Sequence, residues 1–169
     1  MPELSGNLNL DIDAGGDFDI DPNFSITAQY ADLGSDIGPR VSGALEIVYR
    51  DDVLVVNGDG SLVAPDARGA MMPAGNVHLR TRGEFAATIP SFMRSARDGS
   101  FDVSFEFDEL DLATVVGPFS PSLGISGMAS GSLVANGPLF FSPTFAGFVR
   151  FDDLSIGEIT GMDVRFETD

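Results

Sequence analysis

The sequence lacks several residue types on which common chemistries depend. It has no cysteine, no tryptophan and no lysine, and its one histidine is His78. The absence of cysteine excludes disulfides, thiolate catalysis and cysteine-bound zinc, and the absence of lysine excludes Schiff-base chemistry. A Ser-His-Asp triad would have to use His78. The alternation of its strand places His78 on the same side as Arg80 and Arg82, and we expect this side to face solvent. Neither G-x-S-x-G nor G-x-G-x-x-G occurs, so we expect no enzymatic activity and no cofactor.

Long apolar runs and positive charges are also scarce. No apolar run approaches the ~18 residues of a membrane-spanning helix, and the start of the chain has no secretory signal pattern. The 26 acidic residues outnumber the 9 basic ones, all of which are arginines, and the formal net charge is −17. Such a surface repels phosphate backbones, so we expect no nucleic-acid partner. It also repels anionic membrane surfaces at long range.

What the sequence does contain is an alternation of apolar and polar residues, the period of a strand with one wet face. The clearest case is the segment 101–108. Strands recur roughly every 8–12 residues, and turn signals separate them at Gly15-Gly16, Asp51-Asp52, Asn57-Gly58, Asp98-Gly99 and Asn136-Gly137. We therefore predict one all-β domain over residues 1–169, built from about a dozen short strands. At most two short helical turns are expected, at 90–97 and 111–116.

The alternation gathers a large apolar set on one side of the strands, rich in phenylalanine. One layer of strands is enough to supply this set, and the sequence leaves open whether it meets a second sheet or stays uncovered. For each single residue, ordinary core packing explains the pattern equally well. The residues expected on this side are Leu8, Leu10, Ile12, Phe18, Ile20, Phe24, Ile26, Leu45, Ile47, Phe101, Val103, Phe105, Phe107, Leu133, Phe145, Val149 and Phe151.

An acidic cluster near the start of the chain is the one candidate for metal binding. It consists of Asp11, Asp13, Asp17, Asp19 and Asp21, around Gly15 and Gly16. Calcium binds several oxygens at short spacing around a glycine turn, but the distal glutamate of an EF-hand is missing. The alternation of these acids with Ile12, Phe18 and Ile20 equally suits the wet face of a hairpin.

The most specific stretch is 123–151. It contains Ser130-Gly131-Ser132-Leu133, then Asn136-Gly137-Pro138-Leu139, and then Pro143, Gly147 and Val149. This stretch resembles the repeated signature of the TamB and AsmA-like superfamily, in which an SG-x-L strand leads to a G-x-L turn and a P-x-x-x-G-x-V strand. Segment 105–112 looks like the strand and turn that precede that signature, and 43–45 and 54–62 fit its looser pattern.

The resemblance implies an elongated antiparallel or mixed sheet folded along its length into a U-shaped groove, the β-taco. It further implies that the chain is a segment of a longer protein that is anchored in the inner membrane of a Gram-negative bacterium and spans the periplasm. Such proteins are thought to carry phospholipid toward the outer membrane and to assist an outer-membrane barrel partner in protein assembly. Acyl chains would then slide along the apolar residues, at ~0.8 kcal/mol per buried methylene.

A second interpretation belongs to another functional class. The chain would be a structural or adhesive β module of a secreted bacterial protein, with a closed core and calcium bound at the acidic cluster. The two interpretations differ in whether the apolar side is covered by a second layer of the same protein.

Overall fold

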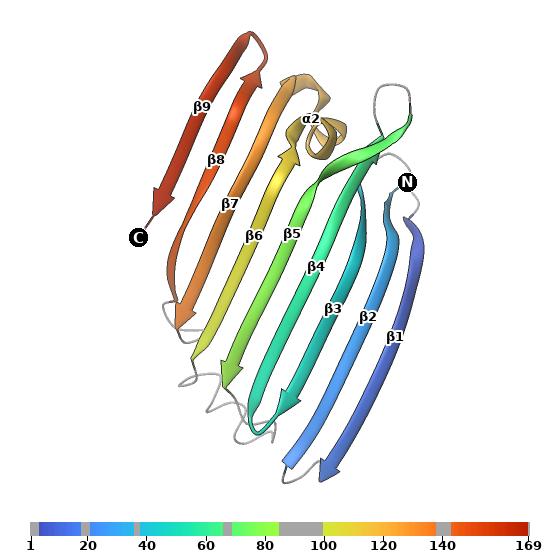
Figure 1. Cartoon of the computed structure of the whole chain (residues 1–169). Helices are drawn as coiled ribbons and strands as arrows, with labels where there is room; N and C mark the ends of the chain where they lie inside the picture. Colours follow the sequence, from blue (N-terminus) through green and yellow to red (C-terminus); the bar gives the residue numbers. More distant parts are fainter. Residues whose placement is uncertain are drawn as a thin grey trace.

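The computed structural model describes residues 4–17, 21–35, 38–65, 69–84, 100–137 and 143–168. They form one nine-stranded antiparallel sheet in which every strand pairs with its neighbours in sequence (Figure 1). The strands are β1 (Leu4–Asp17), β2 (Asp21–Ser35), β3 (Arg40–Arg50), β4 (Val53–Pro65), β5 (Met71–Glu84), β6 (Phe101–Asp111), β7 (Ile125–Gly137), β8 (Thr144–Ile156) and β9 (Ile159–Thr168). The predicted all-β fold is confirmed, and β1 and β9 are the two edges of an open sheet.

The described strands are 10 to 15 residues long, longer than the short strands predicted. The predicted turns at Gly15-Gly16 and Asn57-Gly58 are wrong, because both pairs lie inside strands, β1 and β4. A Cβ atom at Gly58 would lie 3.2 Å from the Leu45 side chain, so this glycine reflects close packing between strands and not a turn. The predicted turn at Asp51-Asp52 is confirmed, with φ of 52° and 59°, as a two-residue hairpin requires.

Helical structure among the described residues is short. The helix α2 (Leu112–Val115) follows β6, and the carboxylate of Asp111 accepts a hydrogen bond from the Ala113 N–H at 3.0 Å. This confirms the short turn predicted after Asp111; the one predicted at 90–97 and the turn at Asp98-Gly99 lie outside the described residues. Two 3-10 turns, η1 (Gly117–Phe119) and η2 (Pro121–Leu123), lead into β7. Within the described residues, no helix has the length and apolar character to span a membrane.

The register of the sheet separates the side chains into two faces. Ile12 pairs with Ile26, Ile26 with Ile47, and Ile47 with Val56, and directly paired residues point to the same side. We call this side the apolar face. Its side chains are Leu8, Leu10, Ile12, Phe24, Ile26, Ala28, Tyr30, Leu45, Ile47, Tyr49, Leu54, Val56, Val77, Leu79, Phe101, Val103, Phe105, Phe107, Leu133, Ala135, Phe145, Val149, Phe151, Val164 and Phe166.

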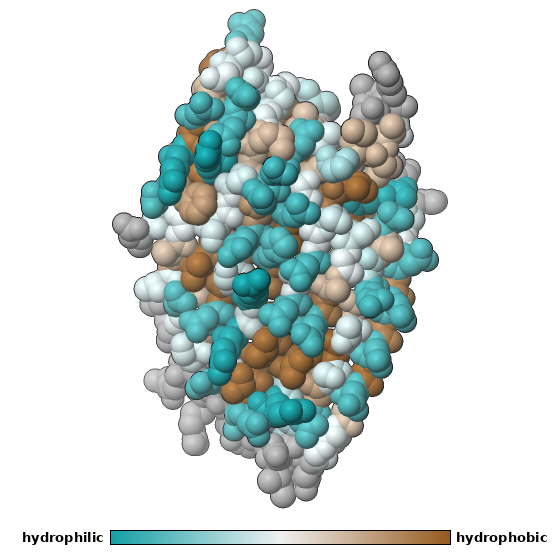
Figure 2. Space-filling view, in the orientation of Figure 1, coloured by the Kyte–Doolittle hydropathy of each residue, from teal (hydrophilic) through white to brown (hydrophobic). Residues whose placement is uncertain are grey.

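The opposite side, the polar face, bears the alternate residues of each strand. Figure 2 shows this side, where hydrophilic residues are spread over the whole height of the sheet and a hydrophobic patch interrupts them in the lower half. His78 lies here, paired with Asp59 and Glu106 of the neighbouring strands, which agrees with its predicted solvent-facing position. The sheet therefore has one mainly polar face and one mainly apolar face.

Candidate functional site

The apolar face is the candidate functional site, because it brings together residues from all nine strands. Every residue that the sequence placed on the apolar side and that the structure describes lies on this face. Phe18 and Ile20 fall outside the described residues. Neighbouring strands lie about 4.8 Å apart, so nine strands give a face roughly 38 Å wide.

No second sheet packs on the apolar face within the part of the chain that the structure describes, since all nine strands belong to one sheet. The consequence is high exposure of large apolar side chains: Leu8 is 57% exposed, Ile12 63%, Phe145 62% and Phe166 64%. The whole chain exposes 10921 Å². A compact monomer of 17.8 kDa would expose about 8,000 Å², so this chain exposes about a third more than that.

Glycines on the apolar face lie beneath large side chains of neighbouring strands. A Cβ atom at Gly131 would lie 2.6 Å from the ring of Phe107, and one at Gly83 would collide with the ring of Phe101. Because glycine has no side chain, the aromatic rings lie across the adjacent strand and the face remains continuous. Gly83 and Gly137 both pair with Phe101, and Gly131 pairs with Phe107.

Tyr30 is a residue of this face that the pattern placed in a strand but not in the site. Its hydroxyl group donates a hydrogen bond to the Asp59 carbonyl oxygen at 2.9 Å, reaching across Gly43 to β4. A Cβ atom at Gly60 would lie 3.3 Å from this hydroxyl. Burial, and secondly the negative charge of Asp59, raise the pKa of Tyr30 above its ordinary value of 10.0. The hydrogen bond holds the Tyr30 ring over β3. In the sequence, only the glycines at positions 43 and 60 could have indicated this contact.

One end of the apolar face is covered by the chain itself. Leu112 of α2 packs with Ala129 of β7 and Leu154 of β8, and these residues are 7%, 3% and 8% exposed. Phe107 and Phe151 contact this cluster from the adjoining part of the face. The face is therefore covered by α2 at one end of β7 and β8, whereas the large side chains of β1 are more than half exposed.

A repeated β-bulge borders the apolar face near this end. Asp32, Glu109 and Asp153 have φ of 55°, 52° and 52°, a conformation that is rare for residues other than glycine. The backbone N–H of each donates to a side-chain oxygen on the next strand, namely Ser42 Oγ at 3.0 Å, Ser130 Oγ at 3.2 Å and Asp163 Oδ1 at 3.2 Å. Each of these acidic residues is followed by a leucine. An acidic residue followed by leucine at the end of an alternating run is therefore a sequence signal for the bulge that we missed. Such bulges bend strands and increase their twist.

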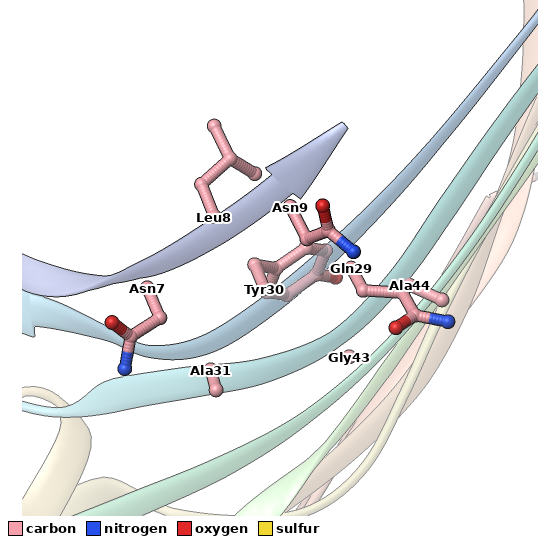
Figure 3. A pocket seen from close by; sticks show the side chains of 8 residues that line it. All are labelled: Asn7, Leu8, Asn9, Gln29, Tyr30, Ala31, Gly43 and Ala44. Carbon is pink, nitrogen blue, oxygen red and sulfur yellow. The ribbon is translucent and has the colours of Figure 1, made fainter. Parts of the chain in front are cut away.

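Two hollows adjoin the apolar residues. One, of about 510 Å³, lies at the start of the sheet and is lined by Asn7, Leu8, Asn9, Gln29, Tyr30, Ala31, Gly43 and Ala44. Figure 3 shows that Leu8 and Asn7 point to opposite sides of β1. The other, of about 210 Å³, lies on the apolar face between β6 and β8 and includes Phe101, Val103 and Phe145 in its lining. The second hollow is open on the apolar face and suits contact with an apolar chain, whereas five of the eight residues that line the first point to the polar face.

The acidic cluster is divided between described and undescribed residues. Asp11 and Asp13 lie exposed on the polar side of β1, and Asp17 pairs with Asp21 at the end of the β1–β2 ladder. Asp19 lies outside the described residues. Within the described ranges, no group of three or more acidic or histidine side chains is placed to hold a metal ion. On the polar face, His78 Nδ1 lies 2.6 Å from Asp59 Oδ1.

The chemistry available to the apolar face is non-covalent contact with apolar groups along its width. The polar face presents solvated charges, including the ion pair of Arg150 with Asp152 at 2.6 Å. In comparisons with known proteins, the chain matches no protein-family model, no curated protein and no solved structure.

Proposed function

We propose that this chain is a lipid-carrying segment of a TamB-like protein, whose apolar face holds phospholipid acyl chains. The observation that carries the proposal is the continuous apolar face of a single sheet, with large side chains exposed on β1 and on β6–β9 and without a second layer in the described residues. Exposed apolar patches of more than a few hundred Å² mark interaction sites in soluble proteins. A surface of this size in water therefore requires an apolar partner.

An acyl chain suits this surface better than a compact ligand does. The face lacks an enclosed cavity in its described part, and its hollow of about 210 Å³ is open. A flexible chain gains free energy from each methylene that it removes from water, up to ~0.8 kcal/mol, and needs no polar contact. The headgroup would stay in water beyond the sheet edge. The negative charge of −17 keeps the protein soluble and off anionic membrane surfaces.

The setting of the function rests on the resemblance of 123–151 to the TamB and AsmA-like signature. This stretch includes the last residue of η2, all of β7 and the first eight residues of β8, and its residues 138–142 lie outside the described ones. Its glycines have packing reasons: Gly131 lies under Phe107, and a Cβ atom at Gly147 would collide with the Ser132 carbonyl oxygen. On this basis we propose a periplasmic protein anchored to the inner membrane, which carries phospholipid between the two membranes. It would support assembly of outer-membrane proteins together with a barrel partner.

The direct test is mass spectrometry of lipid extracted from the purified protein, combined with a matched pair of variants. Phe105→Arg places a charge on the apolar face, whereas Ser132→Arg adds the same charge to the polar face beside Glu106. We expect wild type and Ser132→Arg to retain phospholipid and Phe105→Arg to lose most of it, with all three giving the same far-ultraviolet circular dichroism. Absence of lipid from the wild type, or equal retention in both variants, would refute the proposal.

A further inference from the structure

The outer side of β1 is an open sheet edge. β1 pairs only with β2 within the described sheet, and Leu8, Leu10 and Ile12 are 57%, 53% and 63% exposed. An unpaired strand of this length is a template for pairing with another chain. The same strand has no proline between residues 4 and 17, so its backbone is able to bond a partner along its length.

The residue order of β1 is close to self-complementary. It runs Asn7, Leu8, Asn9, Leu10, Asp11, Ile12 and Asp13. We propose that β1 pairs antiparallel with β1 of a second copy of this chain, about a two-fold axis through Leu10. In that register Leu8 faces Ile12, Asn9 faces Asp11, and Asn7 faces Asp13. Within residues 7–13, each carboxylate then lies opposite an amide, although each copy has a net charge of −17.

The backbone of β1 supports this register. Asp51 and Asp52 form a two-residue hairpin turn, and the residues that flank such a turn, Arg50 and Val53, exchange both backbone hydrogen bonds. Bonded and non-bonded pairs then alternate along each ladder, and a residue that bonds one neighbouring strand does not bond the other. We followed this alternation from β3 through β2 to β1. It directs the backbone N–H and C=O groups of Leu8, Leu10 and Ile12 away from β2, toward the free edge of the sheet. Leu10 then bonds Leu10 of the second copy across the two-fold axis.

The side chains of β1 are available for this contact, whereas those of the other edge are already engaged. The side chains of Asn7, Asn9, Asp11 and Asp13 form no hydrogen bond or ion pair in the described structure. On β9, by contrast, the Asp163 carboxylate accepts from the Asp153 N–H at 3.2 Å. Arg165 Nη2 lies 3.3 Å from Glu167 Oε2, and its guanidinium group covers the Phe148 ring at 4.8 Å. Because the polar side chains of β1 have no partner in the described structure, we propose β1 and not β9 as the edge that pairs with a second copy.

The pairing has a consequence for the apolar face. A two-fold axis perpendicular to the sheet leaves both apolar faces on the same side. The two nine-stranded sheets then join into one, and Leu8 and Ile12 of the two copies become cross-strand neighbours in its centre. This inference concerns self-association of the chain and does not depend on the lipid proposal.

The test is sedimentation velocity of the full chain over a wide concentration range, with charge variants that read the register. Asn9→Asp creates two Asp–Asp contacts across the axis, and we expect it to weaken self-association about three- to tenfold. The double variant Asn9→Asp/Asp11→Asn restores the amide–carboxylate pairs and should recover the wild-type dissociation constant. Added salt should strengthen association in all of them, because it screens the repulsion between two acidic copies.

Arg165→Glu is the matched control on the opposite edge, and it should leave association unchanged. Three outcomes would overturn the proposal. They are a wild-type chain that stays monomeric up to millimolar concentration at high salt, a double variant that associates no better than Asn9→Asp, and an association that Arg165→Glu abolishes while Asn9→Asp leaves it intact. The last result would assign the interface to β9.

Discussion

The two ends of the apolar face contain similar residues in very different surroundings. Over β6–β8, Leu112, Ala129 and Leu154 are at most 8% exposed, because α2 lies on the sheet there. Over β1, Leu8, Leu10 and Ile12 are at least 53% exposed, although they alternate with polar residues in the same way. The difference shows that alternation fixes the face to which a side chain points, whereas burial depends on what covers that face. Folding stability should therefore concentrate under α2, and ligand contact should include the exposed side chains of β1.

The largest expected effect tests this division directly. Leu112→Ala leaves a cavity under α2 and should lower the free energy of unfolding by about 2–4 kcal/mol. Leu10→Ala removes a side chain that is more than half exposed and should cost about 0.5 kcal/mol. Urea denaturation followed by circular dichroism measures both. Equal costs at the two positions would mean that the face over β1 is as well covered as the α2 end.

A smaller effect is expected at the glycines of the two regions. Gly127 borders the covered end with φ of 118°, and a Cβ atom there would lie 2.9 Å from the Asp152 and Asp153 carbonyl oxygens. Gly127→Ala should therefore destabilise the fold by about 2 kcal/mol. Gly58 has ordinary backbone torsions and side-chain neighbours at 3.2 Å or more, so Gly58→Ala should cost less than about 1 kcal/mol. Thermal denaturation shows which of the two variants is less stable. A reversed order would contradict the close backbone packing described for Gly127.

The dependence of folding stability on alkaline pH tests the contribution of Tyr30. Its pKa is raised in the folded state, chiefly by burial, so the folded protein holds this proton more tightly than the unfolded chain. The corresponding stability is present in full below pH 10 and is lost as the pH rises through the folded-state pKa. We expect stability to fall above pH 10 in the wild type and to fall less steeply in Tyr30→Phe. Urea midpoints measured across this range give the answer, and parallel curves would rule out a contribution from Tyr30.

The smallest effect is expected from calcium. The described acids Asp11 and Asp13 are exposed on β1, and a site with millimolar affinity would raise the melting temperature at equal calcium by less than about 2 °C. Differential scanning calorimetry with and without calcium measures the change. A rise well beyond that value would favour the structural or adhesive module instead.

Several features of the fold could be predicted from the sequence because they depend on residues that are close together in the chain. The strict alternation at 101–107 placed four residues of β6 on one face, and the acidic pair at 51–52 marked a true hairpin. The turns predicted at Gly15-Gly16 and Asn57-Gly58 were wrong, because a glycine that makes room for a neighbouring side chain looks the same in sequence as one that turns the chain. The bulges at Asp32, Glu109 and Asp153 were missed for a similar reason: their cause is a hydrogen bond to a side chain of the next strand.

By itself, the sequence determined that the protein is all-β and that most of its large apolar residues in the strands share one side, since side-chain direction in a strand follows from a period of two. Only the tertiary structure decided how the strands are ordered, that α2 covers one end of the apolar face, and that the described strands form a single sheet without an opposing layer. These properties depend on contacts between residues far apart in the chain, and a pattern of period two is the same whether a second sheet covers it or water does.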